Sequence, residues 1–141
     1  MKYLTLICLM LAFGSAQGQT TTQAPAAAVK AETPVQVVER QLKAYNARDA
    51  AAFAATYADN VELLDFPAQL QLTGRAKLQA AYTQFFASAP KLRCEILHRS
   101  VFGNRVIDHE RVTGMPDGKP LEAMAVYEVE NGLIRRVTFI K

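Results

Sequence analysis

The fold of this chain is decided by residues 92–140, which read LRCEILHRSVFGNRVIDHERVTGMPDGKPLEAMAVYEVENGLIRRVTFI. Apolar and polar residues alternate in four runs, separated by turn signals at Gly103-Asn104, Pro116-Asp117-Gly118 and Asn131-Gly132. Alternation with a period of two is typical of strands that bury one face, and dipeptides such as Asn-Gly favour tight hairpins. The stretch therefore predicts a four-stranded antiparallel meander, with strands at 92–102, 105–113, 121–130 and 133–140.

The residues before the meander predict three helices and one more strand. Thr33, followed by Pro34 and Gln36, is a signature of a helix N-terminus, and apolar residues then recur with helical spacing as far as Tyr45. Asp49 is the expected cap of a second helix, which continues past Tyr57 and is closed by residues 59–60. We expect a strand at 61–66, a loop up to 74 and a third helix at 75–88. The order α-α-β-α-β-β-β-β predicts an α+β fold in which the helices cover one face of a mainly antiparallel sheet.

The N-terminus predicts an exported protein. Lys2 is followed by the apolar run YLTLICLMLAF, and Ala16 and Gly18 are small residues at the positions that a signal peptidase recognises. We expect a signal peptide at 1–18, a flexible leader at 19–32 and a single domain at 33–141. The expected location is the periplasm or the extracellular medium.

The composition argues against several classes of protein. Sixteen basic and thirteen acidic residues are interspersed, which argues against a nucleic-acid-binding surface. No apolar run reaches the roughly 18–20 residues of a membrane span. Cys8 leaves with the signal peptide, so Cys94 remains alone and is expected to be a small buried apolar residue. His98 and His109 show no metal-ligand spacing, and no phosphate-binding glycine loop is present, so the sequence predicts no metal and no cofactor.

Several segments, in their order along the chain, resemble one family. They are AYNARD at 44–49, YADN at 57–60, DFP at 65–67, GR at 74–75, DHERVTG at 108–114 and YEVENGLI at 127–134. Together they are similar to the nuclear transport factor 2-like superfamily, in its ketosteroid-isomerase-like and SnoaL-like (polyketide-cyclase-like) branch. The resemblance implies a cone-shaped barrel, formed by a curved sheet around a long helix, with a pocket at its open end and a homodimer packed through the sheets. It leaves the activity open, because the superfamily includes isomerases, cyclases, dehydratases and binding modules.

Asp65 is the first candidate for the site. It shares a strand face with Val61 and Leu63, where a carboxylate loses hydration, so its pKa is expected to rise towards the range of a general base. The resemblance implies the same role, because the isomerase base occupies this spacing after the Tyr-Ala-Asp segment. The alternative is an aspartate exposed to water that caps the turn at Phe66-Pro67.

Two tyrosines are the candidate hydrogen-bond donors. The resemblance places Gln41 and Ala125 where the isomerase has its donor Tyr and its protonated Asp, so the expected oxyanion donors are absent. Tyr45 continues the buried stripe of the first helix, and Tyr127 shares a strand face with small residues that would leave space beside its ring. The alternative for both is ordinary aromatic packing.

Two acids in the middle of a strand complete the candidates. Asp108 and Glu110 share one face, where they either line the pocket as an acid/base pair or form ion pairs with arginines of neighbouring strands. Those arginines are Arg99, Arg111 and Arg136. The expected pocket lining also includes Gln41, Leu63, Ala125 and Phe139.

Two classes of function follow from these residues. The first is an exported small domain whose hydrophobic pocket holds a small organic ligand. The second is an enzyme of the isomerase or cyclase type, in which Asp65 is the general base acting on a carbonyl substrate. The expected partners are a small apolar molecule and a second copy of the chain.

Overall fold

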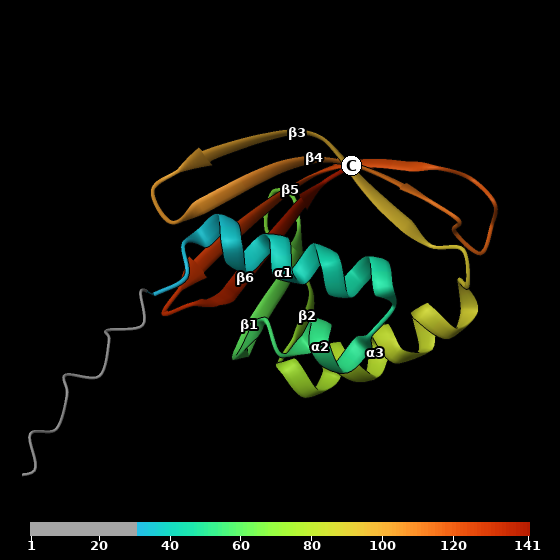
Figure 1. Cartoon of the computed structure of the whole chain (residues 1–141), viewed down its shortest axis with the longest axis horizontal. Helices are drawn as coiled ribbons and strands as arrows, with labels where there is room; N and C mark the ends of the chain where they lie inside the picture. Colours follow the sequence, from blue (N-terminus) through green and yellow to red (C-terminus); the bar gives the residue numbers. More distant parts are fainter. Residues whose placement is uncertain (1–30) are drawn as a thin grey trace, which may run out of the picture.

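The computed structural model describes residues 31–141 and shows three helices covering one face of a six-stranded sheet (Figure 1). The elements are α1 (Pro34–Ala47), α2 (Ala50–Ala54), β1 (Tyr57–Asp65), β2 (Gln69–Thr73), α3 (Arg75–Ser88), β3 (Arg93–Phe102), β4 (Arg105–Thr113), β5 (Leu121–Glu130) and β6 (Leu133–Ile140). The predicted signal peptide at 1–18 and residues 19–30 of the predicted leader lie outside the described residues. Among residues 31–141, no helix is long and apolar enough to cross a membrane.

Helix α1 begins at the predicted capping box. Thr33 Oγ1 accepts a hydrogen bond from the Gln36 backbone N–H, and Gln36 Oε1 accepts one from the Thr33 N–H. The helix ends at Ala47 and is capped by Arg48, whose φ of 56° lies in the left-handed region and whose N–H donates back to the last carbonyl groups of the helix. Its inward stripe packs against strands β3 to β6, and Gln41 and Tyr45 are on the side that faces the sheet.

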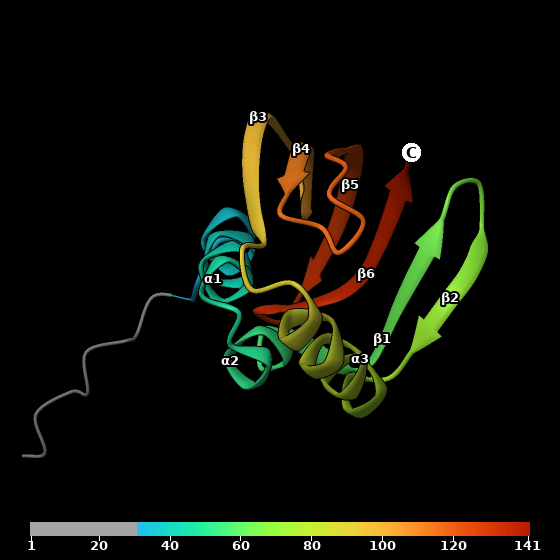
Figure 2. The same ribbon diagram turned by 90° about the vertical axis from the view of Figure 1, so that its right-hand side faces the viewer.

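The six strands form one sheet in the order β2-β1-β6-β5-β4-β3. Strands β3 to β6 form the predicted antiparallel meander with its three predicted turns, so that prediction is confirmed. Strand β1 pairs antiparallel with β2 and parallel with β6. The sheet curves around the helices, but β2 and β3 remain as free edges (Figure 2). The α+β fold is therefore as predicted, whereas the implied cone-shaped barrel is an open, curved sheet.

Two segments differ from the expectation. Residues 69–73, expected to be a loop, form β2, which continues the sheet beyond β1. The second helix, expected to run past Tyr57, ends at Ala54, and Tyr57 begins β1. Tyr57 is paired with Ile134 of β6, and the Ile134 N–H donates to the carbonyl oxygen of Thr56 at 2.9 Å. This pairing with a distant strand overrides the local helical pattern.

The hydrophobic core lies between the helices and the concave face of the sheet. Phe53 of α2, Leu78 of α3 and Ile134 of β6 are completely buried in it. Burial alternates strictly along β4 and β5, so that every second side chain of each strand points towards the helices. This alternation brings Asp108 and Glu110 of β4, and Ala123, Ala125 and Tyr127 of β5, to the inner face.

Candidate functional site

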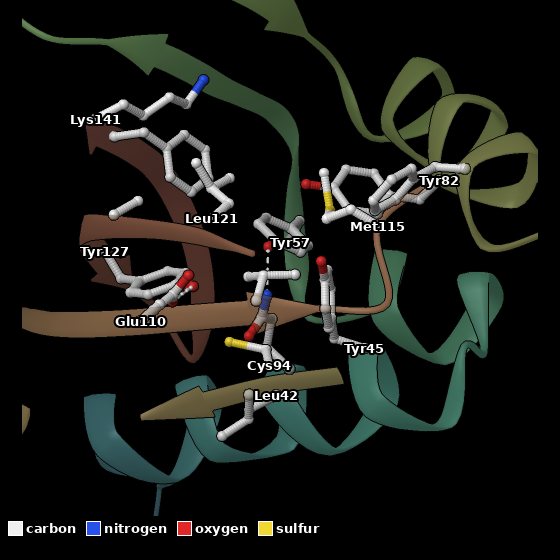
Figure 3. Close-up of a pocket in the computed structure, with 15 residues that line it drawn as sticks. Leu42, Tyr45, Tyr57, Tyr82, Cys94, Glu110, Met115, Leu121, Tyr127 and Lys141 are labelled. Atoms are coloured by element: carbon white, nitrogen blue, oxygen red, sulfur yellow. Dashed lines mark hydrogen bonds between the residues drawn. The ribbon is translucent and has the colours of Figure 1, made fainter. Parts of the chain in front are cut away.

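A cavity of about 190 Å³ opens between α1, α3 and the inner face of the sheet (Figure 3). Its lining comes from all three layers and is largely aromatic and aliphatic. The lining residues are Gln41, Leu42, Tyr45, Tyr57, Tyr82, Phe85, Cys94, Glu110, Val112, Met115, Leu121, Ala123, Tyr127, Phe139 and Lys141. In the sheet register, Glu110 is directly opposite Ala123, and a methyl group at that place leaves space in front of the carboxyl group.

Glu110 is the only acid among the described residues that line this cavity. Its side chain is 8% exposed, and its Oε1 accepts a hydrogen bond of 2.7 Å from the hydroxyl group of Tyr127. No other hydrogen bond to this carboxyl group exists within residues 31–141, so Oε2 is free to meet a ligand. Figure 3 shows the two side chains next to each other on one side of the cavity.

Burial raises the pKa of Glu110 from its usual 4.5 to about 7. The hydrogen bond from Tyr127 opposes this rise because it stabilises the charged form, and the negative charge of Asp108 adds to it. The positive charge of Arg99 also opposes the rise in pKa, but its effect is smaller than those of burial, Tyr127 and Asp108. A carboxyl group with a pKa near 7 exchanges its proton at neutral pH, as a general acid or base must.

Asp108 behaves differently from Glu110, although the two share one strand face. Its side chain is 1% exposed, and both of its oxygens accept hydrogen bonds from Arg99, at 2.7 Å from Nε and 2.8 Å from Nη2. Arg99 is directly opposite Asp108 in the register of β3 and β4. The sequence left open a pocket acid or a cross-strand ion pair for both residues. In the structure Asp108 forms the ion pair with Arg99, and Glu110 lines the cavity.

Three further phenol groups reach the cavity. The hydroxyl oxygen of Tyr57 accepts a hydrogen bond of 3.0 Å from Gln41 Nε2, which leaves its own proton available. Tyr45 and Tyr82 come from α1 and α3, and their hydroxyl groups point into the cavity in Figure 3. Burial is the main cause that raises the pKa of all three above the usual 10, so they remain protonated donors at neutral pH.

Asp65, expected to face the pocket as a base, is not among the lining residues. It ends β1 and is half-buried, and its Oδ1 is 2.9 Å from Nζ of Lys141, which follows β6. The sequence offered no nearby basic partner for Asp65, because Lys141 reaches it only through the parallel pairing of β1 with β6. Glu110 therefore replaces Asp65 as the candidate acid–base group.

The other predicted site residues divide into two groups. Gln41, Tyr45, Tyr127 and Phe139 line the cavity together with Glu110. Leu63 and Ala125 are buried in the core and do not line it. Both residues are on an inner strand face, as predicted. An inner face can contact either the packed core or a cavity, and the alternation of apolar and polar residues does not show which.

Sequence reasoning missed several lining residues. The sequence predicts a helix around Tyr57, and Tyr82 lies within the predicted helix at 75–88, where helical spacing indicates no cavity. Cys94 was expected to be a small buried apolar residue, and it is buried, but its thiol lines the cavity. Burial raises the pKa of this thiol to about 12, which argues against a nucleophilic role at neutral pH. No cluster of three or more potential metal ligands occurs among the described residues.

Comparison with known proteins decides the family. Residues 38–137 match the SnoaL-like domain. The chain belongs to the SnoaL-like domain family. No curated protein sequence matches this SnoaL-like chain.

Solved structures support the same fold. A cystatin-fold protein from Novosphingobium aromaticivorans is 24% identical, with a TM-score of 0.72 over 78% of this chain and 99% of that one. A candidate polyketide cyclase from Sinorhizobium meliloti is 20% identical, with a TM-score of 0.63 over 73% of this chain and 92% of that one. A candidate ketosteroid isomerase from Kribbella flavida is 22% identical, with a TM-score of 0.61 over 74% and 73%. At these identities the likeness establishes the SnoaL-like fold and no activity.

The pKa of Glu110 makes the stability of this SnoaL-like domain depend on pH. The native state holds the Glu110 proton more tightly than the unfolded state does, so stability should fall as the pH rises from about 4.5 to about 7. The shift corresponds to about 3 kcal/mol in the free energy of unfolding. Glu110→Gln keeps the shape and removes the titration, so it should abolish this fall and stabilise the domain above neutral pH.

Urea unfolding at a series of pH values measures this effect. Glu122→Gln is the control, because Glu122 lies in an exposed ion pair with Arg111 on the outer face of the sheet, and it should leave the fall in place. A stability profile of Glu110→Gln that is parallel to the wild-type profile would show that Glu110 titrates normally.

Proposed function

We propose that this domain binds a small, largely apolar organic molecule in the cavity, with Glu110 holding the polar group of that molecule. The observation that carries the proposal is the buried carboxyl group of Glu110, which offers a free Oε2 to a cavity lined mostly by rings and aliphatic chains. Ligand sites of proteins combine an apolar lining with few polar groups in this way.

The size of the cavity limits the ligand. An engineered apolar cavity of about 150 Å³ holds a benzene molecule. A cavity of about 190 Å³ therefore suits a ligand with a single ring and a short substituent. A molecule of several fused rings would have to displace side chains or extend into the solvent.

Single-ring compounds test this proposal. We expect benzyl alcohol, benzylamine or cyclohexanone to shift the amide NMR signals of lining residues such as Tyr82, Cys94 and Leu121. Ala123→Phe puts a ring into the space in front of Glu110 and should weaken binding roughly tenfold or more. Met124→Phe is the matched control, because Met124 is on the opposite face of the same strand. Absence of shifts for all three compounds, or equal binding by Ala123→Phe, would contradict the proposal.

A second candidate is proton transfer of the isomerase or cyclase type. The pKa of Glu110 near 7 favours it, because a general base works best when its pKa is close to the working pH. Tyr57, whose hydroxyl proton is free, is then a candidate donor to a carbonyl oxygen. Exchange of the α-hydrogens of cyclohexanone in heavy water tests this candidate. It predicts that the domain accelerates exchange and that Glu110→Gln does not.

We further propose that the chain is exported and cleaved before Gln19. Lys2, the apolar run at 3–13 and the small residues Ala16 and Gly18 support this proposal. The intact mass of the protein recovered from the periplasm or the medium tests it, and a mass that includes Met1 would contradict it.

We also propose a homodimer packed through the outer face of the sheet. The support is a row that crosses four strands, in which Leu64, Thr138, Val126 and Ile107 are successive partners, all partly exposed and all apolar except Thr138. Val126→Lys places a charge in the centre of this row. Sedimentation should give a dimer for the wild type and a monomer for this variant, and a monomeric wild type would contradict the proposal.

A further inference from the structure

The two buried carboxyl groups of the described chain differ in their charge balance. Asp108 receives two hydrogen bonds from the guanidinium group of Arg99, which is a complete ion pair. Glu110 receives one hydrogen bond from a neutral phenol, and no basic group of residues 31–141 is within ion-pair distance of it. A buried carboxylate without a cation is costly, because its charge has lost water and gained no opposite charge.

The cavity does not supply the missing cation. Lys141 is the only basic side chain among the described lining residues, and it is half exposed at the rim with its Nζ 2.9 Å from Asp65. Arg99 is already bound to both oxygens of Asp108. The remaining titratable groups around Glu110 are neutral at neutral pH, and they are Tyr45 of α1, Tyr57 of β1, Tyr82 of α3, Cys94 of β3 and Tyr127 of β5.

The walls of the cavity are also of a kind that attracts positive charge. Six aromatic side chains contribute to the lining, and four of them are the tyrosines around Glu110. The face of an aromatic ring carries partial negative charge and attracts ammonium groups, more strongly when water is excluded. The phenol oxygens of Tyr45 and Tyr82 are free acceptors for the N–H groups of such a ligand, because neither makes a hydrogen bond within the described chain.

We propose that the ligand of this cavity is a small organic ammonium ion, a protonated amine with one ring, whose positive charge pairs with Oε2 of Glu110. The ligand thus supplies to Glu110 the positive charge that Arg99 supplies to Asp108. This inference rests on the proposed ligand-binding function and names the class of ligand. The ammonium group loses water on entry, and the carboxylate and the ring faces together offset that loss.

Benzylamine and benzyl alcohol test the charge, because they have the same size and shape and differ only in the polar group. Calorimetric titration at about pH 8, where Glu110 is ionised and benzylamine is protonated, should give benzylamine an affinity roughly tenfold or more above that of benzyl alcohol. Glu110→Gln should remove this preference. Benzoate, the anion of similar shape, should bind worst.

A measurement on the wild type alone guards against a variant that does not fold. Glu110 is protonated at about pH 5, so benzylamine should bind about tenfold more weakly there than at about pH 8, while benzyl alcohol should change little. Equal or tighter binding of benzyl alcohol, lost in Ala123→Phe, would overturn the cationic ligand and leave the proposed ligand-binding function intact. Tighter binding of benzoate than of the other two compounds would likewise overturn the cationic ligand and leave the ligand-binding function intact. No binding by any of the three compounds would overturn both.

Discussion

Gly114→Ala is expected to destabilise the domain by about 2–4 kcal/mol. Gly114 follows β4 with a φ of 73°, a left-handed conformation that costs a residue with a Cβ. A Cβ at this position would also overlap the backbone carbonyl group of Lys91, just before β3. Because the obstacle is backbone, no side-chain rotation can relieve it, and β4 would have to move away from the segment that leads into β3.

Gly118→Ala is the matched control for this prediction. Gly118 belongs to the same β4–β5 connection and has the same φ of 73°, but an added Cβ would meet nothing within 4 Å. Its substitution should cost only about 1 kcal/mol, for the left-handed conformation alone. Urea unfolding of both variants isolates the contribution of the close approach, and equal losses would show that Gly114 does not pack against Lys91.

Arg99→Met is expected to cost about 3–5 kcal/mol at neutral pH, because it removes the cation from a carboxylate that is 1% exposed. Adding Asp108→Val to Arg99→Met should recover most of this loss. Apolar side chains of similar size commonly replace a buried ion pair at little cost. The single and double variants form a cycle that separates the energy of the pair from the energy of packing.

Arg111→Met is the control for Arg99→Met. Arg111 likewise pairs with a carboxylate of the neighbouring strand, at 2.7 Å from Oε1 of Glu122, but both side chains are nearly half exposed. The loss of stability in Arg111→Met should be close to the error of the unfolding measurement, because water solvates the charges of an exposed ion pair when they separate. If Arg99→Met costs as little as Arg111→Met, Asp108 is not buried with its charge.

The meander could be predicted because its signals are local. Each turn is indicated by two or three consecutive residues, and the alternation of apolar and polar residues between turns determines which side chains point inward. The start of β1 could not be predicted in the same way. The residues around Tyr57 resemble the end of a helix, and their strand conformation depends on Ile134 in the last strand. Strand β2 is likewise defined by its pairing with β1 more than by its own short pattern.

The sequence predicts which strand face carries the acids of the candidate site, but not which basic residue pairs with each acid. Alternation placed Asp108 and Glu110 together on the inner face, and it could not say which of them Arg99 would neutralise. The register of β3 with β4 decides this, because it sets Arg99 opposite Asp108 and leaves Glu110 beside the cavity. The position of Asp65 could not be predicted for a similar reason, since its partner Lys141 follows β6, far from β1 in the sequence.

Glu110 is a buried, titratable group that faces the cavity. An NMR titration of its side-chain carboxyl carbon measures this directly, with the resonance assigned by its absence from Glu110→Gln. We predict a midpoint near pH 7, well above the usual 4.5 of a glutamate. A midpoint at or below 4.5 would mean that Glu110 is solvated or paired with a cation, which would contradict its burial at the cavity.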